Sequence, residues 1–335
     1  SIADFSGKRV GAQKQTTQEQ LAKTQLPGAK VTSLDKANDV VAQISYNKLD
    51  AGVLASTIAD SYVARTPSLT VIDPHFATDK APTAIAVSKQ SPALLKQVNK
   101  TISKVKGAKY KSYLQAAYKL QDQDQGFWAK YGNYFIRGAI YTLVFAVLTV
   151  LFGTIIGTLL ALMKLSRNWL AKVVANIYIE FIRGTPLLVQ AFIVFFGTQI
   201  LGLDLSAFVA GAIAMAINSG AYVAEIIRGG INSVPVGQTE AARSLGLHQS
   251  QAMRYVILPQ AMKNIWPALG NEFVTDIKES SVLSVIGATE LMFEGTVVQG
   301  ASFKPFLPLV VVAILYFIMT FTLSRLLRLI EKRFN

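Results

Sequence analysis

Eight polar side chains lie within or beside long apolar runs in the second half of the sequence, where a polar group needs a partner or a watery cavity. Amide, hydroxyl and charged groups at such positions are costly against lipid, so we predict that they face a water-filled cavity. Each also has a structural interpretation, because a charged residue can form an ion pair and a serine can permit close helix packing. The eight are Asn218, Ser219, Glu225, Lys278, Glu279, Ser280, Ser281 and Glu290.

The composition argues against other kinds of chemistry. The 335 residues include no Cys and two His, which excludes thiol chemistry and speaks against a metal site, so we predict no catalytic residue and no metal. The Gly-x-x-x-x-Gly-Lys-Ser/Thr phosphate loop does not occur in the sequence, and we expect no cofactor in this chain. The net charge of +13 is spread over both halves, so we expect no nucleic-acid partner.

Four uncharged runs predict membrane spans. Residues 138–163 form a run of 26, long enough at 1.5 Å per residue to cross a hydrocarbon core of roughly 30 Å. Runs of 20 uncharged residues follow at 184–203, 205–224 and 305–324. Hydropathy does not decide whether residues 264–299 form a span, because four charged residues interrupt this stretch: Glu272, Asp276, Lys278 and Glu279.

The distribution of basic residues predicts the orientation, since short basic loops stay in the cytoplasm. Basic residues follow the first and third runs and fill the C-terminal tail. If these segments share the cytoplasm, the chain crosses the membrane an odd number of times and its N-terminal part lies outside. Residues 264–299 must then hold a fifth span in addition to the four uncharged runs. Aromatic residues precede the first run, as is typical of entry into the headgroup layer: Phe127, Trp128, Tyr131, Tyr134 and Phe135.

The segment after the third run predicts a short helix outside the membrane. Pro235 and Gly237 end the preceding helix, residues 238–245 read as helical, and Gly246 permits a sharp turn. The small residues Ala241 and Ala242 would allow this helix to sit deep in a partner's groove. The alternative is an ordinary amphipathic connector.

The same segment resembles the EAA loop of ABC importer permeases, which docks on the ATP-binding subunit. The matching residues are Glu240, Ala241, Ala242, Gly246, Leu258 and Pro259, with Val256 where the family usually has Ile. Segments 180–190, 218–229 and 278–291 resemble the polar amino acid permeases in particular. This resemblance implies five spans, an EAA loop near 233–262, and a location in the bacterial cytoplasmic membrane. It further implies a separate nucleotide-binding subunit that holds ATP and Mg, and a second permease copy or a paralogue. With this resemblance, the eight polar residues named at the start are predicted to adjoin a translocation path suited to a zwitterion.

The first 126 residues alternate short β-rich and helical runs, which predicts an α/β layer with a mostly parallel sheet. Strands are expected at 8–12, 30–33, 50–54, 69–72 and 83–87. Helices are expected at 18–22, 36–47, 91–105 and 110–120.

This pattern resembles the second lobe and return segment of an extracytoplasmic amino-acid-binding protein of the periplasmic type II fold. Matching stretches are 7–17, which includes Gln13, then 49–53 and about 84–120. Thr16 and Thr17 match the family's Gly-Thr-Thr turn, which binds the ligand's carboxylate, but Gln15 replaces its Gly. Ala55 stands where the family has an Asp for the ligand's ammonium. The alternative is that the two threonines only cap the following helix.

Together these features predict an outer domain at 1–122 and a five-helix transmembrane permease domain at 123–335. The leading interpretation is a permease with a fused binding domain in an ATP-driven importer of polar amino acids, with glutamine, glutamate or asparagine slightly favoured. A membrane receptor that senses without transport is the first alternative. An ion-coupled carrier is the second, but the inverted repeats typical of such carriers are not evident.

Overall fold

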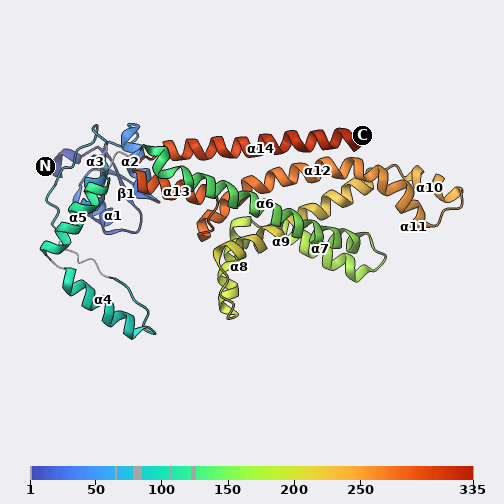
Figure 1. The fold of residues 1–335 in the computed structure, drawn as a ribbon, viewed down its shortest axis with the longest axis horizontal. Coiled ribbons are helices and arrows are strands. Elements are labelled where there is room, and N and C mark those ends of the chain that lie inside the picture. Colours follow the sequence, from blue (N-terminus) through green and yellow to red (C-terminus); the bar gives the residue numbers. More distant parts are fainter. Residues whose placement is uncertain (1, 65, 78–84, 106, 122–125, 335) are drawn as a thin grey trace. The chain divides into compact units, whose positions relative to one another are not determined.

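A computed structural model describes residues 2–64, 66–77, 85–105, 107–121 and 126–334 (Figure 1). The chain divides into two compact units. The first contains Ser1–Lys130 with Gly300–Phe306, and the second contains Tyr131–Gln299 with Leu307–Asn335. The domain boundary predicted between 122 and 123 lies outside the described residues, so it stays a prediction.

The first unit is built on a small parallel sheet. After the 3-10 turn Ile2–Phe5, the chain forms β1 (Arg9–Gln13), α1 (Thr17–Gln25), β2 (Lys30–Leu34), α2 (Ala37–Ser45), β3 (Ala51–Val53) and α3 (Ser56–Val63). The strand order is β2-β1-β3, and Val10 pairs with both Val31 and Ala51. Val10, Ala12, Ala22 and Leu26 form the core between the sheet and α1. β1 is the central strand of this order, so its middle residues are buried.

Two predicted strands are wrong in the described residues. Residues 69–72 and 85–87 have no strand pairing, and residues 83 and 84 lie outside the described part of the chain. The side chains explain this, because Val71 and Ile72 are 44% and 63% exposed and do not reach the core. The later helices fit the expected ranges and form α4 (Pro92–Val105) and α5 (Ala108–Gln121).

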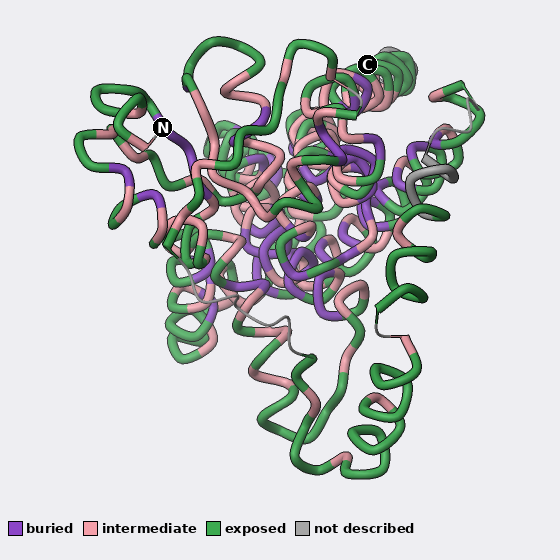
Figure 2. Tube along the Cα trace, turned by 90° about the vertical axis from the view of Figure 1, so that its left-hand side faces the viewer, coloured by how far each residue is buried: buried purple, intermediate pink, exposed green. Residues whose placement is uncertain are grey.

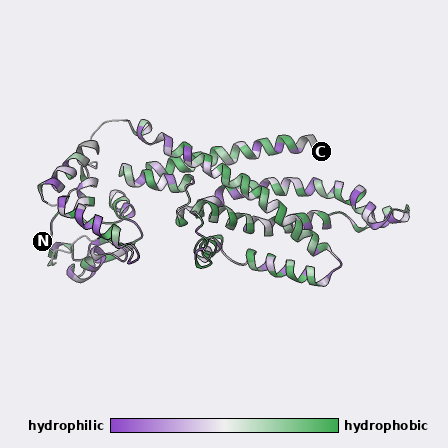
Figure 3. Ribbon diagram, turned by 60° about the horizontal axis from the view of Figure 1, so that its bottom comes forward, coloured by the Kyte–Doolittle hydropathy of each residue, from purple (hydrophilic) through white to green (hydrophobic). Residues whose placement is uncertain are grey.

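The second unit is helical. Its elements are α6 (Phe127–Leu165), α7 (Trp169–Arg183), α8 (Leu187–Ile200), α9 (Ala207–Asn232), α10 (Val236–Ser244), α11 (Gln249–Ala252), the π-helical turn η2 (Met253–Ile257), α12 (Leu258–Glu279), the 3-10 segment η3 (Ser280–Ile286), α13 (Leu291–Ser302) and α14 (Leu307–Phe334). Apolar residues dominate the long helices (Figure 3).

Three helices, α6, α9 and α14, are long and apolar enough to cross a membrane. Two bent pairs pass the same test together, α7 with α8 at 106° and 249–286 with α13 at 51°. The predicted count of five is reached if each bent pair is one span. Sequence analysis missed α7, which lies where a connection was expected. Its break from α8 falls at Gly184 and Pro186, because proline cannot continue the hydrogen-bonded ladder of a helix.

Small residues bring α6 and α9 together, and many residues of both helices belong to the buried class drawn in purple in Figure 2. A Cβ on Gly157 would lie 2.6 Å from Val223 and 2.8 Å from the carbonyl oxygen of Gly220. A side chain there would push the two helices apart. Small residues at such crossings are typical of helix packing in lipid.

Candidate functional site

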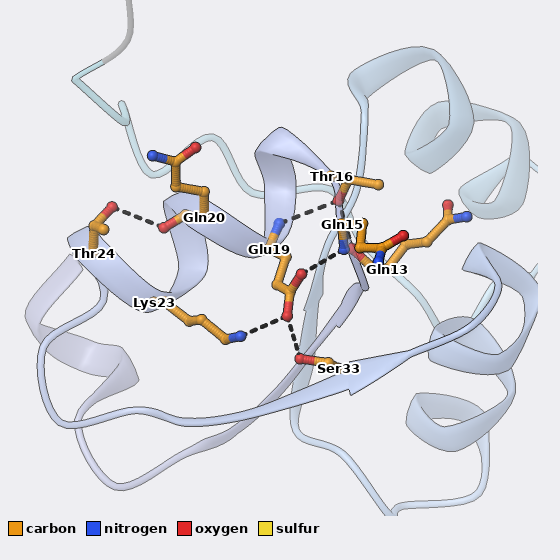
Figure 4. Close-up of polar contacts among 8 residues, drawn as sticks. All are labelled: Gln13, Gln15, Thr16, Glu19, Gln20, Lys23, Thr24 and Ser33. Carbon is orange, nitrogen blue, oxygen red and sulfur yellow. Dashed lines mark hydrogen bonds and ion pairs between the residues drawn. The ribbon is translucent and has the colours of Figure 1, made fainter.

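The predicted carboxylate-binding turn lies between β1 and α1 (Figure 4). Thr16 is the N-cap of α1, and its hydroxyl accepts a hydrogen bond of 3.3 Å from the Glu19 amide. The same hydroxyl donates to the Gln13 carbonyl at 2.6 Å. Thr17 is the first residue of the helix and is exposed. The structural alternative therefore describes Thr16 well, since its side chain is fully engaged in capping.

The Glu19 carboxylate lies against this turn. It accepts hydrogen bonds from the Gln15 amide at 2.6 Å and from Ser33, and it pairs with Lys23 at 2.5 Å. Lys23, Ser33 and the Gln15 amide together lower the pKa of Glu19 to about 2. Gln15 has a φ of +60°, a backbone conformation that favours glycine. The carboxylate thus holds a turn that glycine would adopt without strain.

The sheet places this turn beside the second predicted contact. In the order β2-β1-β3, the chain leaves β1 toward one edge and β3 lies on the other side. The carboxyl ends of β1 and β3 therefore flank a topological switch point, the place where a ligand crevice is expected in a parallel sheet. Gln13 ends β1, and Ala55 follows β3 as the N-cap of α3. Ala55 offers no side-chain cap. The four residues predicted for this site lie at the same edge of the sheet.

In the second unit, one of the eight predicted path residues lines a cavity with carboxylates. The Ser219 hydroxyl of α9 donates to Asp276 of α12 at 3.2 Å. The cavity holds about 170 Å³ and Glu272 also lines it, while most other lining residues are apolar. Within the described residues, no ion pair involves Asp276 or Glu272. The site can therefore receive a cationic group that the chain itself does not supply.

Asn218 and Glu225 are engaged in structural contacts. The Asn218 amide donates to Gln190 at 3.0 Å, and Gln190 in turn donates to the carbonyl oxygens of Ile182 and Thr185 at the break between α7 and α8. Glu225 pairs with Lys164 at 2.7 Å and Arg228 at 2.8 Å, and Arg183 lies 4.0 Å away. These contacts tie helix ends together, which favours the structural interpretation of both residues.

The remaining predicted path residues lie around the end of α12. The hydroxyls of Ser280 and Ser281 donate back to the carbonyls of Ile277 and Lys278, three residues earlier. Lys278 is exposed and Glu279 is half-buried. Glu290 is buried, accepts the amides of Met292 and Phe293 at the start of α13, and accepts the Tyr316 hydroxyl at 2.6 Å. The structure does not bring these five to the cavity of Ser219.

Sequence reasoning treated Glu272 and Asp276 only as interruptions of an apolar run. Their spacing of four residues places them on the same face of a helix, and this signal could have identified them. It also missed the buried Glu294, which pairs with Arg137 at 2.6 Å between α13 and α6. A single carboxylate in an apolar segment gave no sign of that distant partner.

The predicted loop after the third run forms a protruding helix and turn. α10 ends at Leu245, which is 84% exposed, and Gly246 has a φ of +87°. Glu240 and Ala241 are exposed, whereas Ala242 is buried. Leu258 and Pro259 begin α12. Glu240 has no ion pair within the part of the chain that the structure describes.

These features are those of a membrane transport component: apolar helices, a polar cavity between them and an exposed helical loop. Residues 151–335 match the family described as "Binding-protein-dependent transport system inner membrane component". The chain belongs to this family, and it is a transport subunit and not an enzyme.

Named relatives support this assignment. The putative glutamine transport system permease protein GlnP of Rickettsia bellii is 42% identical over 201 residues, which cover 60% of this chain and 92% of that protein. The arginine transport system permease protein ArtQ of Bacillus subtilis is 37% identical over the same shares. A crystal structure described as an amino acid ABC transporter with histidines is 51% identical, with a TM-score of 0.59, and the match covers 61% of this chain and 95% of that one.

Proposed function

We propose that the chain is the permease subunit of an ATP-driven importer of polar amino acids. ATP is hydrolysed by a separate nucleotide-binding subunit with its own Mg, and a second permease copy or a paralogue completes the pathway. The names of the relatives support an amino acid as substrate. None of the relatives described above is named as a sensor, and no observation favours the receptor alternative.

The observation that carries the proposal is the exposed loop around α10. A leucine that is 84% exposed and an unpaired acidic residue, Glu240, lie on one short helix and its turn. The loop keeps a firm base, because Val234, Ile257, Ala261 and Ile265 pack together beneath it. A rigid, partly apolar protrusion fits a groove on the nucleotide-binding subunit. Closure of that subunit would then move the loop and the helices attached to it.

The cavity of Ser219, Glu272 and Asp276 is our proposed part of the substrate path. An amino acid brings an ammonium group, and two carboxylates that form no ion pair in the described part of the chain suit it. The relatives named for glutamine and for arginine transport both fit this chemistry. Glutamine, glutamate or asparagine is the substrate that we expect first. The prediction also places five residues beside the path: Lys278, Glu279, Ser280, Ser281 and Glu290. Their contacts support a role in shaping α12 and α13.

For the first unit we propose the second lobe of an extracytoplasmic binding domain, fused to the permease and lying outside the cell, with the C-terminus in the cytoplasm. The order β2-β1-β3 and the crevice beside Gln13, Thr16 and Ala55 support this proposal. The Glu19 carboxylate at the turn and the absence of an acid at position 55 favour weak binding of an α-amino acid.

Glu240→Lys tests the coupling. We expect the charge reversal to abolish uptake of labelled glutamine and arginine in proteoliposomes that also hold the nucleotide-binding subunit, while the permease stays folded. Asp60→Lys, a reversal at an exposed position of α3, is the matched control and should leave uptake unchanged. Uptake by Glu240→Lys at the wild-type rate would show that the loop does not couple the two subunits.

A further inference from the structure

A groove lies between α12 and α14 toward the C-terminal end of the last apolar helix. It holds about 310 Å³ and is lined by both apolar and polar residues. Gly270 of α12 and Leu327 of α14 form part of the floor, and a Cβ on Gly270 would lie 3.3 Å from Leu327. Trp266 lines the groove and is 39% exposed. A tryptophan beside an apolar floor is typical of the headgroup level of a bilayer.

Two opposite charges line the same groove. Arg328 and Glu331 lie three residues apart on α14, yet no ion pair joins them in the described part of the chain. The Arg328 Nε donates to the Ser324 carbonyl at 3.2 Å, which leaves the two terminal nitrogens of the guanidinium for another acceptor. The uncharged run of this helix ends at Ser324, so both charges lie just beyond its apolar stretch.

We infer that this groove binds the headgroup of an aminophospholipid. The phosphate lies on the Arg328 guanidinium, whose planar fork suits phosphate oxygens. The primary ammonium of an ethanolamine headgroup lies on the Glu331 carboxylate, and the first carbons of an acyl chain cover Gly270 and Leu327. A purely anionic headgroup leaves Glu331 unpaired beside a negative charge. A choline headgroup carries no N–H to donate to it.

Native mass spectrometry of the full chain, purified in detergent, tests this inference. Phosphatidylethanolamine, phosphatidylglycerol and phosphatidylcholine are added at equal concentrations. We expect phosphatidylethanolamine to be retained about tenfold more than either other lipid, the size expected for one charge-assisted hydrogen bond. Arg328→Gln should lower the retention of all three lipids. Glu331→Gln should remove only the preference for phosphatidylethanolamine over phosphatidylglycerol.

Arg325→Gln is the matched control. Arg325 is one turn earlier on α14, its guanidinium lies over the Phe321 ring at 5.1 Å, and it does not line the groove. Retention by Arg325→Gln should equal that of wild type. Helical content and thermal unfolding of each variant establish that the fold is kept, which is expected because Arg328 and Arg325 are exposed.

Competition with soluble glycerophosphoethanolamine distinguishes binding of a lipid from binding of a free phosphate ester that carries the same headgroup. Glycerophosphoethanolamine lacks acyl chains, so we expect it not to displace the bound lipid at the same concentration. Displacement would assign the groove to a soluble ester and overturn the lipid assignment. Equal retention of the three lipids by wild type, or retention that survives Arg328→Gln, would overturn the site itself. None of these readouts depends on transport, so the inference can fail while the proposed function stands.

Discussion

Carboxylates meet different surroundings in the two units of the chain. Glu19 in the first unit lies beside a main-chain amide, a hydroxyl and a lysine, and all three contact it. Asp276 in the second unit is 3% exposed, and the Ser219 hydroxyl is the one donor found for it among the described residues. The first carboxylate is satisfied at the surface, whereas the second is buried beside a cavity without a cation.

This difference separates a structural charge from a candidate binding charge. Taking a carboxylate out of water is costly unless a partner compensates for it. Glu19 has its partners within the folded chain, so it stabilises the turn and occupies amide donors that a ligand would need. Burial removes Asp276 from water, and its one hydrogen bond from Ser219 compensates for only part of the desolvation cost. A transported ammonium could supply the rest, so the polar site of the second unit is better prepared for a ligand than that of the first unit.

The largest expected effect comes from Asp276→Asn. If the carboxylate contacts the substrate's ammonium, its loss removes a charge-assisted hydrogen bond of about 1.5 to 3 kcal/mol, which corresponds to about one to two decades in affinity. We expect the KM for uptake of glutamine and arginine in proteoliposomes to rise by about that factor. The shape of the side chain is almost unchanged, so the fold should be kept.

Thr275→Val is the control for this prediction. Thr275 directly precedes Asp276 on α12, but its hydroxyl donates to its own helix at the Asn271 carbonyl. Its removal should leave the KM unchanged. If Asp276→Asn transports with wild-type kinetics, Asp276 is a structural charge like Glu19, and the proposed difference between the two units is wrong.

A smaller effect is expected from Ala55→Asp in the first unit, which adds the missing acid at the crevice. The new carboxylate should tighten binding of glutamine to the full chain by about tenfold, the low end for a charge-assisted contact. Calorimetry of the chain in nanodiscs measures this. An Asp at position 55 would also cap α3, which alone stabilises a helix by about 1 kcal/mol.

Ala55→Asn separates these two contributions, because asparagine caps a helix about as well as aspartate but carries no charge. Equal binding by the two variants would assign any gain to the stiffer helix. No gain from either would mean that position 55 does not face the ligand, and that the alignment with the binding-protein family is mistaken there.

Sequence patterns predicted the features that local physics determines. Uncharged runs predicted α6, α9 and α14, and the placement of Gly246 predicted the turn after α10, where φ is indeed positive. Alternating runs predicted the strands of the sheet that pair, but not that 69–72 would stay outside it. That segment lies outside the sheet because its apolar side chains Val71 and Ile72 remain largely exposed and do not reach the core.

Contacts between distant residues could not be predicted in the same way. The bend at Gly184 is held by Gln190 and Asn218, which are 28 residues apart, and Glu294 meets Arg137 across 157 residues. Asp276 was hidden for another reason, because hydropathy counts a carboxylate as evidence against a span. The position of its side chain at a cavity depends on the packing of α9 against α12.

The smallest effect concerns the surface carboxylate itself. The pKa of Glu19 is about 2, below the ordinary value of 4.5, because the folded turn favours the ionised form. Its contribution to stability is therefore complete above about pH 4.5 and is lost as the pH falls toward 2.

Glu19→Gln should have a looser β1–α1 turn at pH 4.5 than wild type, and the two should become alike near pH 2. Pepsin cleavage within residues 13–34 of the full chain measures the turn's opening across this range, and we expect a difference of about two- to threefold at pH 4.5, in keeping with an exposed pair. Asp60→Asn removes an exposed carboxylate of α3 and should leave cleavage in this segment unchanged at every pH. A difference between Glu19→Gln and wild type that persists undiminished at pH 2 would show that the glutamine disturbs the turn by its shape, and that the charge of Glu19 does not hold it.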